Sequence, residues 1–221
     1  MEKNKTGKYL KYAIGEIILV VIGILIALQI NNWNESKKSQ TVLNNYKERL
    51  IRQFKEDSVS LDNFNRTHEH VQPIFKNLDS IFRENHKGKT TIDSIIKVPV
   101  FITLQSEFIS ATTVIDELFN TGSLDLFKND ELKDLLAGYK NLITQQHDII
   151  RRTKSKFEDF DNLLSEVSMY SEREYLIKSN KINSDYFMNK YWFINAVREG
   201  EKMQFDKLEK TNNNILTLLR Q

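Results

Sequence analysis

The sequence has no cysteine, and this absence excludes disulfide bridges, thiol chemistry and zinc sites with cysteine ligands. Only two prolines and seven glycines interrupt its 221 residues. So few helix-breaking residues are typical of a protein built from long helices. One domain of this length can bury a hydrophobic core without cross-links, and a cysteine-free domain tolerates an oxidising compartment such as the periplasm.

The sequence also lacks an excess of charge of either sign. Of its 32 basic and 30 acidic residues, four and two precede residue 34, which leaves 28 of each sign in the rest of the chain. Nucleic-acid binding needs a basic surface that neutralises phosphates, so we expect no nucleic-acid partner. No Ser/His/Asp order, phosphate-binding glycine loop or paired-carboxylate site stands out, and the sequence therefore predicts neither an enzyme nor a cofactor.

The one long apolar run is "YAIGEIILVVIGILIALQINNW", Tyr12 to Trp33. Its first nineteen residues would rise roughly 28 Å as a helix, close to the hydrocarbon thickness of a bilayer. A cleavable signal peptide would need small residues before its cut, and the run ends Ala27-Leu28-Gln29-Ile30 without them. A buried core helix is rarely apolar on all sides. We predict an uncleaved anchor at residues 12–33, with the lipid bilayer as a partner.

The lysine distribution predicts the orientation of this anchor. Four lysines crowd the leader, residues 1–11, whereas four basic residues follow the span within twenty residues; they are Lys3, Lys5, Lys8 and Lys11, and then Lys37, Lys38, Lys47 and Arg49. The denser leader favours a cytoplasmic N-terminus. Residues 34–221 would then lie in the periplasm, beside an inner membrane.

Apolar residues at steps of three and four predict that one helix continues from the anchor to about Gln72, where Pro73 ends or kinks it. Ile74 to Phe82 allow a short continuation. Asp57 and His68 fall on the apolar stripe of this helix. The segment Val98 to Gln105 is rich in β-branched residues, but no second strand-like run pairs with it, so we expect an extended connector.

Three more helices are expected after this connector. A short helix over 107–120 should end at Gly122, and Asn129 should cap a long helix whose first turn holds Asp130 and Glu131. The last helix follows a polar break at 178–184. The apolar stripes of the long and last helices are Leu132, Leu135, Tyr139, Leu142, Gln146, Ile149, Thr153, Phe160, Leu164 and Val167, and then Phe187, Tyr191, Ile194, Phe205, Leu208, Ile215 and Leu219. The predicted fold is all-α: one transmembrane helix and an antiparallel bundle of three long helices with one or two short ones.

Two stretches resemble a known family: "KYAIGEIILVVIGILIALQINNWNE" and "DELFNTGSLDLFKNDELKDLLAGYK". They are similar to uncharacterised single-pass membrane proteins abundant in Bacteroidota, and they cover less than a third of the chain. The positions that match the second pattern are Glu117, Leu118, Thr121, Gly122, Leu124, Asn129, Glu131, Leu132 and Tyr139. That family often has two tyrosines where this chain has Gly138-Tyr139. The resemblance implies an inner-membrane protein of a Gram-negative cell and no particular activity.

Glu16 is the one acidic residue in the apolar run. On a helix, Glu16, Val20, Gly23 and Ala27 fall within about 60° of one another, and Gly23 and Ala27 form a small-xxx-small pair that lets two helices approach closely. We therefore predict a membrane-helix interface on this stripe, and a homo-oligomer. Glu16 could instead reach headgroup water, or carry protons as in energiser subunits of proton channels.

Two further clusters have ordinary structural explanations. His68 and His70, two residues apart on a helix, point about 200° apart and cannot share a metal ion. We expect His68 to lie in the core, paired with a residue such as Gln146 or Thr153. The aromatic segment "DYFMNKYWF", Asp185 to Phe193, could line a ligand pocket or touch a membrane, but helical spacing favours the bundle core.

The sequence therefore favours a non-catalytic, membrane-anchored interaction or scaffold protein that self-associates and has an unidentified protein partner. A periplasmic small-molecule sensor that acts through a partner is the alternative. A proton-coupled energiser subunit that uses Glu16 is a second alternative.

Overall fold

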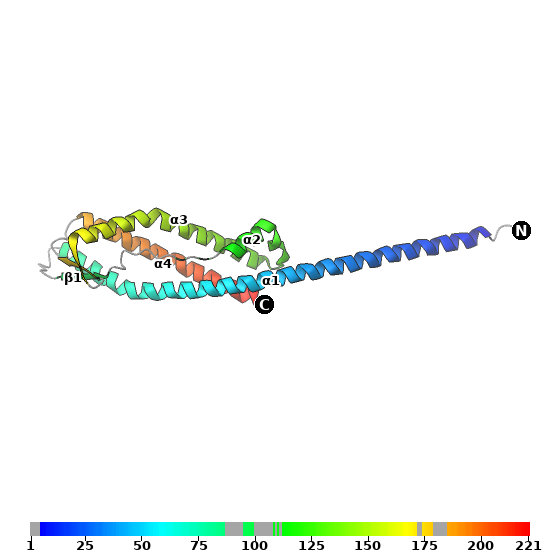
Figure 1. Ribbon diagram of the computed structural model, residues 1–221, viewed down its shortest axis with the longest axis horizontal. Coiled ribbons are helices and arrows are strands. Elements are labelled where there is room, and N and C mark those ends of the chain that lie inside the picture. Colours follow the sequence, from blue (N-terminus) through cyan, green and yellow to red (C-terminus); the bar gives the residue numbers. More distant parts are fainter. Residues whose placement is uncertain are drawn as a thin grey trace.

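Three long helices dominate the computed structural model of the protein (Figure 1), which describes residues 5–86, 95–99, 108, 110, 112–171, 174–178 and 185–221. The helices are α1 (Lys5–His86), the short α2 (Thr113–Thr121), α3 (Asp130–Val167) and α4 (Asp185–Leu219), with the 3₁₀ helix η2 (Ser123–Leu126) before α3. The strands are β1 (Ile95–Pro99), β2 (Ser168–Ser171) and β3 (Glu174–Lys178). The predicted all-α class is confirmed, with a small sheet added.

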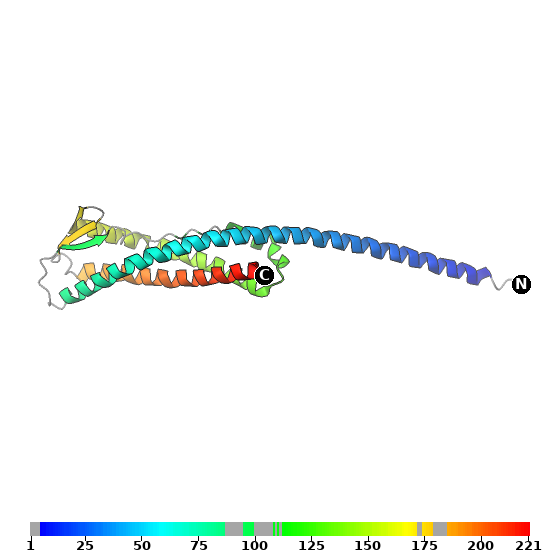
Figure 2. The ribbon, with the colours of Figure 1, turned by 90° about the horizontal axis from the view of Figure 1, so that it is seen from below.

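Helix α1 has 82 residues and two different parts. Its first part projects away from the rest of the molecule (Figures 1 and 2), and every described side chain from residue 12 to residue 42 is exposed. The second part, from Leu43 onward, forms one wall of the bundle. We call the end where α1 joins the bundle the entry end, and the opposite end the far end. Helix α2, η2 and the C-terminus lie at the entry end.

Helices α1 and α3 run in the same direction, and α4 runs antiparallel to both. Contacts show the direction of each pair. On α1, Asn65 bonds Glu209 whereas Gln72, further along, bonds Glu199, earlier in α4. On α3, Leu142 bonds Gln204 whereas Asp159, further along, bonds Lys190, earlier in α4. Strand β1 lies at the far end and α2 at the entry end (Figure 1), so α3 starts beside the start of the α1 wall.

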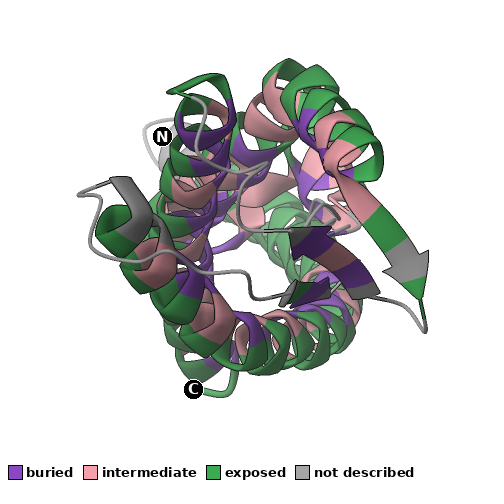
Figure 3. Ribbon diagram, turned by 90° about the vertical axis from the view of Figure 1, so that its left-hand side faces the viewer, coloured by how far each residue is buried: buried purple, intermediate pink, exposed green. Residues whose placement is uncertain are grey.

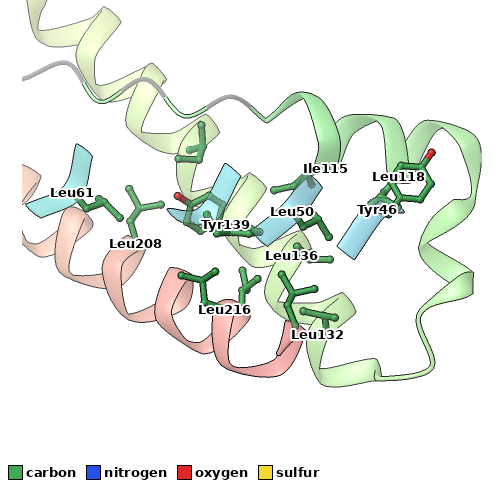
Figure 4. Packing of buried hydrophobic residues seen from close by; sticks show 14 of the residues in the cluster. Tyr46, Leu50, Leu61, Ile115, Leu118, Leu132, Leu136, Tyr139, Leu208 and Leu216 are labelled. Atoms are coloured by element: carbon green, nitrogen blue, oxygen red, sulfur yellow. The ribbon is translucent and has the colours of Figure 1, made fainter. Parts of the chain in front are cut away.

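The bundle has two hydrophobic cores, and buried residues face its interior (Figure 3). The entry-end core gathers residues such as Leu50, Ile115, Leu132, Tyr139 and Leu216 from all four helices (Figure 4). The far-end core gathers Phe75, Phe160, Tyr175, Ile177 and Tyr191, among others. The prediction for the last helix is confirmed, since every residue of its predicted stripe is buried. The predicted stripe of α3 is confirmed in part. Its buried members are Leu132, Tyr139, Gln146, Phe160 and Leu164, whereas Leu135 and Leu142 are only half-buried and their neighbours Leu136 and Ile143 are buried instead.

The prediction that Pro73 could end the first helix is wrong, and the short continuation over Ile74 to Phe82 is confirmed, because α1 continues through Pro73 to His86. Proline removes one hydrogen bond to the carbonyl four residues earlier. That carbonyl belongs to Glu69, which is exposed to water. The residues beyond Pro73 gain burial in the far-end core, where Phe75 is 3% and Leu78 is 2% exposed. Packing therefore outweighs the lost bond.

The expectation that Val98 lies in an unpaired connector is also wrong. Strand β1 pairs antiparallel with β3, and β3 pairs antiparallel with β2, in the order β1-β3-β2. Val98 faces Tyr175 in this register, and both side chains are buried. The partner run at 168–178 directly follows α3, and its short strands do not stand out in the sequence. Most of the expected connector, 100–105, and the polar break at 179–184 lie outside the described residues.

Candidate functional site at the entry end

The residues of the second sequence motif come together at the entry end. Leu118, Leu132 and Tyr139 are fully buried in its core, and Leu124 packs against it. Helix α2 begins at Thr113, later than the predicted 107, because Phe108 and Ser110 lie outside the helix and are themselves buried. This cluster therefore builds the walls of the entry end rather than an open catalytic centre.

Two helix ends in this cluster match the sequence prediction. Gly122 has φ 69° and ends α2 in the left-handed conformation that glycine tolerates best. The side chain of Asn129 accepts a hydrogen bond from the Leu132 backbone N–H at 3.0 Å, which caps α3. The Thr121 hydroxyl donates to the Glu117 carbonyl at 2.8 Å, and Glu131 is exposed in the first turn of α3. The turn between the two helices is thus fixed at both sides.

Consecutive acidic residues on α2 clamp it to two other helices. The Arg49 guanidinium on α1 donates to both oxygens of Glu117, at 3.1 and 2.5 Å, and the Tyr46 hydroxyl donates to Glu117 at 3.0 Å. Asp116 lies 2.7 Å from the Lys140 ammonium on α3. Arg49 and Lys140 hold the pKa values of Glu117 and Asp116 below their usual range, so both carboxyl groups stay charged.

A third carboxylate, Asp57 on α1, is buried at 3% exposure. Its Oδ2 accepts hydrogen bonds from the Ser110 hydroxyl at 2.7 Å and the Tyr139 hydroxyl at 2.8 Å. Burial raises the pKa of Asp57, although its two donors oppose the shift. Burial and the charge of Asp57 also raise the pKa of Tyr139, which therefore stays protonated as a donor. The network joins α1 to α3, and it gives the apolar-stripe position of Asp57 a structural explanation.

A groove opens beside this cluster, in the corner between α1 and the entry end of the bundle. It has a volume of about 510 Å³, within the range of ligand sites. One wall is α1 from Ser36 to Lys47, and the other is the turn from Asp125 to Asn129 with Leu132 and Leu218. The sequence carries no signal for this groove, because its walls come from three separate parts of the chain.

The predicted membrane-helix stripe lies outside the bundle. Glu16, Val20, Gly23 and Ala27 are all exposed, and a Cβ added at Gly23 would meet no atom within 4 Å. The stripe is therefore open for contact, and its role as an interface stays a prediction. The apolar part of α1 makes it the one helix, among the described residues, that is long and apolar enough to cross a membrane.

Other predicted positions lie elsewhere. His68 is half-buried, stacks on Phe64 at 6.0 Å between ring centres and approaches Gln72 at 3.1 Å, so the expected pairing with Gln146 or Thr153 is wrong. Burial lowers the pKa of His68. The described residues contain no group of three His, Cys, Asp or Glu side chains that could hold a metal ion.

The aromatic segment at the start of α4 is divided between core and surface. Phe187 and Tyr191 are buried in the far-end core, whereas the other three aromatics, Tyr186, Trp192 and Phe193, are 61%, 40% and 45% exposed. Tyr191 donates to the Phe75 carbonyl at 2.8 Å and so joins α4 to α1 beyond Pro73. The expectation of a core role therefore holds for two of the five.

Sequence reasoning missed a buried charged layer between the two cores. Arg198 on α4 is 7% exposed, and its guanidinium lies 5.3 Å from the Phe75 ring centre and 5.5 Å from that of Phe157. Burial lowers the pKa of Arg198, and Glu201, itself 1% exposed, opposes the shift. The sequence shows no signal for this layer, because charged residues on a long helix normally face water.

The fold and the entry-end site together define a class of protein, in which an exposed apolar helix continues without interruption into a helical bundle. Residues 16–82 match the model of a family described as a family of unknown function, DUF6090. The matched segment lies entirely on α1 and combines most of the apolar part with most of the bundle wall, while the α2–α3 motif lies outside it. No curated protein and no solved structure matches the chain.

Proposed function

We propose that this protein is a non-catalytic scaffold, anchored in a membrane by a single helix and self-associating through that helix. The main observation in support is that the most apolar 18-residue stretch of α1 is not buried at all within the molecule. An apolar surface of this size is not stable in water and marks a surface that lipid or another protein covers. A continuous helix also satisfies its own backbone hydrogen bonds in hydrocarbon.

The direction of the bundle relative to the anchor stripe supports self-association. At 100° per residue, the α1 side chains that enter the core, such as Leu50 and Phe54, lie about 140–180° around the helix from Ala27. The bundle therefore packs on the face of α1 opposite to Glu16, Gly23 and Ala27. The stripe continues beyond the anchor into exposed residues, and a second α1 can approach it without meeting the bundle.

The polar groups of the entry end support a structural role rather than catalysis. Arg49, Lys140, Ser110 and Tyr139 each bond a carboxylate on a different element, so their bonds hold helices together. We propose an inner-membrane location with the bundle in the periplasm, on the basis of the lysine-dense leader and the family resemblance.

Cysteine crosslinking in native membranes tests the proposal, because the chain has no cysteine of its own. Lys38→Cys lies on the continuation of the anchor stripe, and Ser36→Cys, at nearly the same height, lies about 200° away around the helix. We expect crosslinked dimers from Lys38→Cys and none from the matched control Ser36→Cys. Equal crosslinking at both positions would contradict a defined interface.

The anchor variants make the same test within the membrane. Gly23→Ile should remove most of the dimer, because its bulk prevents close approach of two helices. Glu16→Gln should have a mild effect, since an amide still donates a hydrogen bond, and Glu16→Leu should fall between the two. A transmembrane self-association assay of the full chain ranks the three variants, and unchanged association of Gly23→Ile would exclude the stripe.

A reporter fusion measures on which side of the membrane the bundle lies. Alkaline phosphatase fused after Gln221 should be active if the bundle lies outside the cytoplasm, whereas activity of a fusion that works only inside the cytoplasm would reverse the proposed topology.

A further inference from the structure

We propose that the paired α1 helices stay side by side beyond the membrane, where a charged patch on each helix binds the same patch of a second copy. The patch consists of Glu48, Arg52, Lys55 and Glu56. It lies about 20–35 Å beyond Trp33 by the helical rise. The inference rests on the self-association proposed above and adds to it a second contact surface, outside the anchor.

The outward face of α1 keeps one direction from the anchor to the bundle wall. Gly23, Thr41 and Val59 are spaced by 18 residues, which make five full turns, so they lie at the same angle around the helix. Thr41 is exposed, and the Val59 side chain is 62% exposed although it is apolar. The core residues Leu50 and Phe54 lie about 180–220° away from this direction. Because α1 is one continuous helix, two copies that meet at Gly23 turn this same outward face toward each other further along.

The patch is complementary to itself across a two-fold axis. Relative to Gly23, Glu48 and Lys55 lie at about −20° and −40° around the helix, and Arg52 and Glu56 at about +20° and +60°. In a parallel two-fold pair, a residue on one side of the contact line meets a residue on the other side of the partner's line. Glu48 therefore meets Arg52 of the second copy, and Lys55 meets Glu56 of the second copy. The two patches together carry no net charge.

The charges of the patch have no partners within their own chain. All four side chains are exposed, and together with Ile51 they line a groove of about 360 Å³ on the outside of α1. None of the four forms an ion pair within the described part of the chain. Elsewhere on α1, by contrast, exposed arginines bond an aspartate four residues earlier, as in the pairs Arg66–Asp62 and Arg83–Asp79. The patch thus holds unpaired charges of both signs on the face that the bundle leaves open.

Contact at the patch requires nearly parallel helices. Helices that cross at about 20° wind around each other and stay in contact, whereas a crossing of about 40° separates them within a few turns. The proposal therefore also states that the small crossing angle applies to α1.

Charge reversal in the full chain tests the patch. Gln221→Cys gives a single site for a fluorescent label, because the chain has no cysteine of its own, and energy transfer between labelled copies in phosphatidylcholine vesicles measures dimerisation. Glu48→Arg and Arg52→Glu should each weaken the dimer about tenfold, because repulsion replaces two symmetry-related attractions. A mixture of the two variants should form heterodimers in preference to either homodimer, since their patches then differ in charge.

The matched controls are Lys154→Glu and Glu158→Arg. These two exposed residues have the same spacing on α3, on the other side of the bundle core. Both changes should leave dimerisation unchanged. An equal loss of dimer in these controls would show that net charge, not the patch, controls association, and it would overturn the proposal.

The outcomes separate the patch from the anchor interface. If Gly23→Ile leaves association unchanged, the proposed anchor interface fails. If Gly23→Ile removes the dimer but the mixture of charge variants gives no excess of heterodimer, the patch proposal fails alone. Crosslinking gives a second measurement: Val59→Cys should form dimers and Ser60→Cys, about 100° around the helix, should not. Crosslinks from Lys38→Cys without crosslinks from Val59→Cys would show that the helices separate beyond the membrane, and they would overturn the patch.

Discussion

The two ends of the bundle share α1, α3 and α4 but are closed in different ways. The entry end is closed by α2 and η2, which ion pairs attach to α1 and α3 and which the Asp57 network supports from inside. The far end is closed by a three-stranded sheet that covers an aromatic core. Between the ends lies the Arg198 layer. The same three helices can thus support a polar, bonded end beside the proposed membrane and an apolar end away from it.

The strongest test of this comparison removes one large side chain from each core. Phe54 and Phe160 are 0% and 1% exposed, and replacement of either by alanine should lower the free energy of unfolding by about 3–5 kcal/mol through lost burial and a cavity. Urea unfolding of the full chain in detergent measures this loss of free energy. Hydrogen exchange measures the location, and we expect Phe54→Ala to expose amides of the entry end first. Equal loss of protection at both ends would show that the two cores open as one unit.

A substitution in the layer between the cores should also destabilise the chain. Arg198→Met keeps much of the apolar contact with Phe75 and Phe157 but removes the buried positive charge that Glu201 favours. A buried acidic group that loses a favourable nearby charge destabilises the folded state, and we expect a lower free energy of unfolding. The double variant Arg198→Met/Glu201→Leu should recover a large part of this loss. No recovery would show that Arg198 acts through a contact other than Glu201.

The entry end could be predicted from the sequence in more detail than the far end, and the reason is physical. Gly122 and Asn129 act on their own helix ends, so a few neighbouring residues determine their roles. Strand β1 forms only because β3, about eighty residues later, supplies its partner. Helix continuation through Pro73 likewise depends on burial against Tyr191, far along the chain. The sequence predicts interactions within one helical turn, but it does not predict those between distant segments.

The candidate site shows the same division. The sequence identified Glu117 and Tyr139 as members of a motif and Asp57 as a polar residue on an apolar stripe. It did not show that Arg49 and Ser110 are the partners of Glu117 and Asp57, because those pairs form only when the helices pack. The groove requires three segments at once and has no linear signature.

Variants of Asp57 test the polar network that supports the entry end, and we expect a change in the free energy of unfolding of intermediate size. Asp57→Ala leaves the Ser110 and Tyr139 hydroxyl groups without their acceptor, and we expect a loss of about 1–3 kcal/mol for each buried group that stays unpaired. Asp57→Asn keeps an acceptor oxygen and removes the buried charge, so its stability near neutral pH should equal or exceed that of the native chain. An equal loss in both variants would show that the negative charge itself is needed.

The pH dependence of the unfolding free energy tests independently whether the charge of Asp57 destabilises the folded chain. The pKa of Asp57 is raised in the folded chain, so its penalty is present above that folded pKa and is relieved as the pH falls toward the unfolded value. Asp116 and Glu117 have lowered pKa values, and their stabilisation is lost as the pH falls. Asp57→Asn removes only the first effect. Its unfolding free energy should therefore fall more steeply than that of the native chain between about pH 7 and about pH 4.

The smallest expected effects come from two glycines within the entry-end motif stretch, and they should differ in sign. Gly122 has a positive φ with open space around an added Cβ, so Gly122→Ala should destabilise the chain by about 1 kcal/mol through backbone strain alone. Gly138 lies inside α3, and an added Cβ there also meets no atom within 4 Å. Gly138→Ala should therefore stabilise the chain by about 0.5–1 kcal/mol, because alanine restricts the unfolded state and favours helix. Since neither change creates a contact, urea unfolding of the two variants compares backbone conformation directly, and a stabilising Gly122→Ala would mean that the α2–η2 turn does not hold Gly122 in the left-handed conformation.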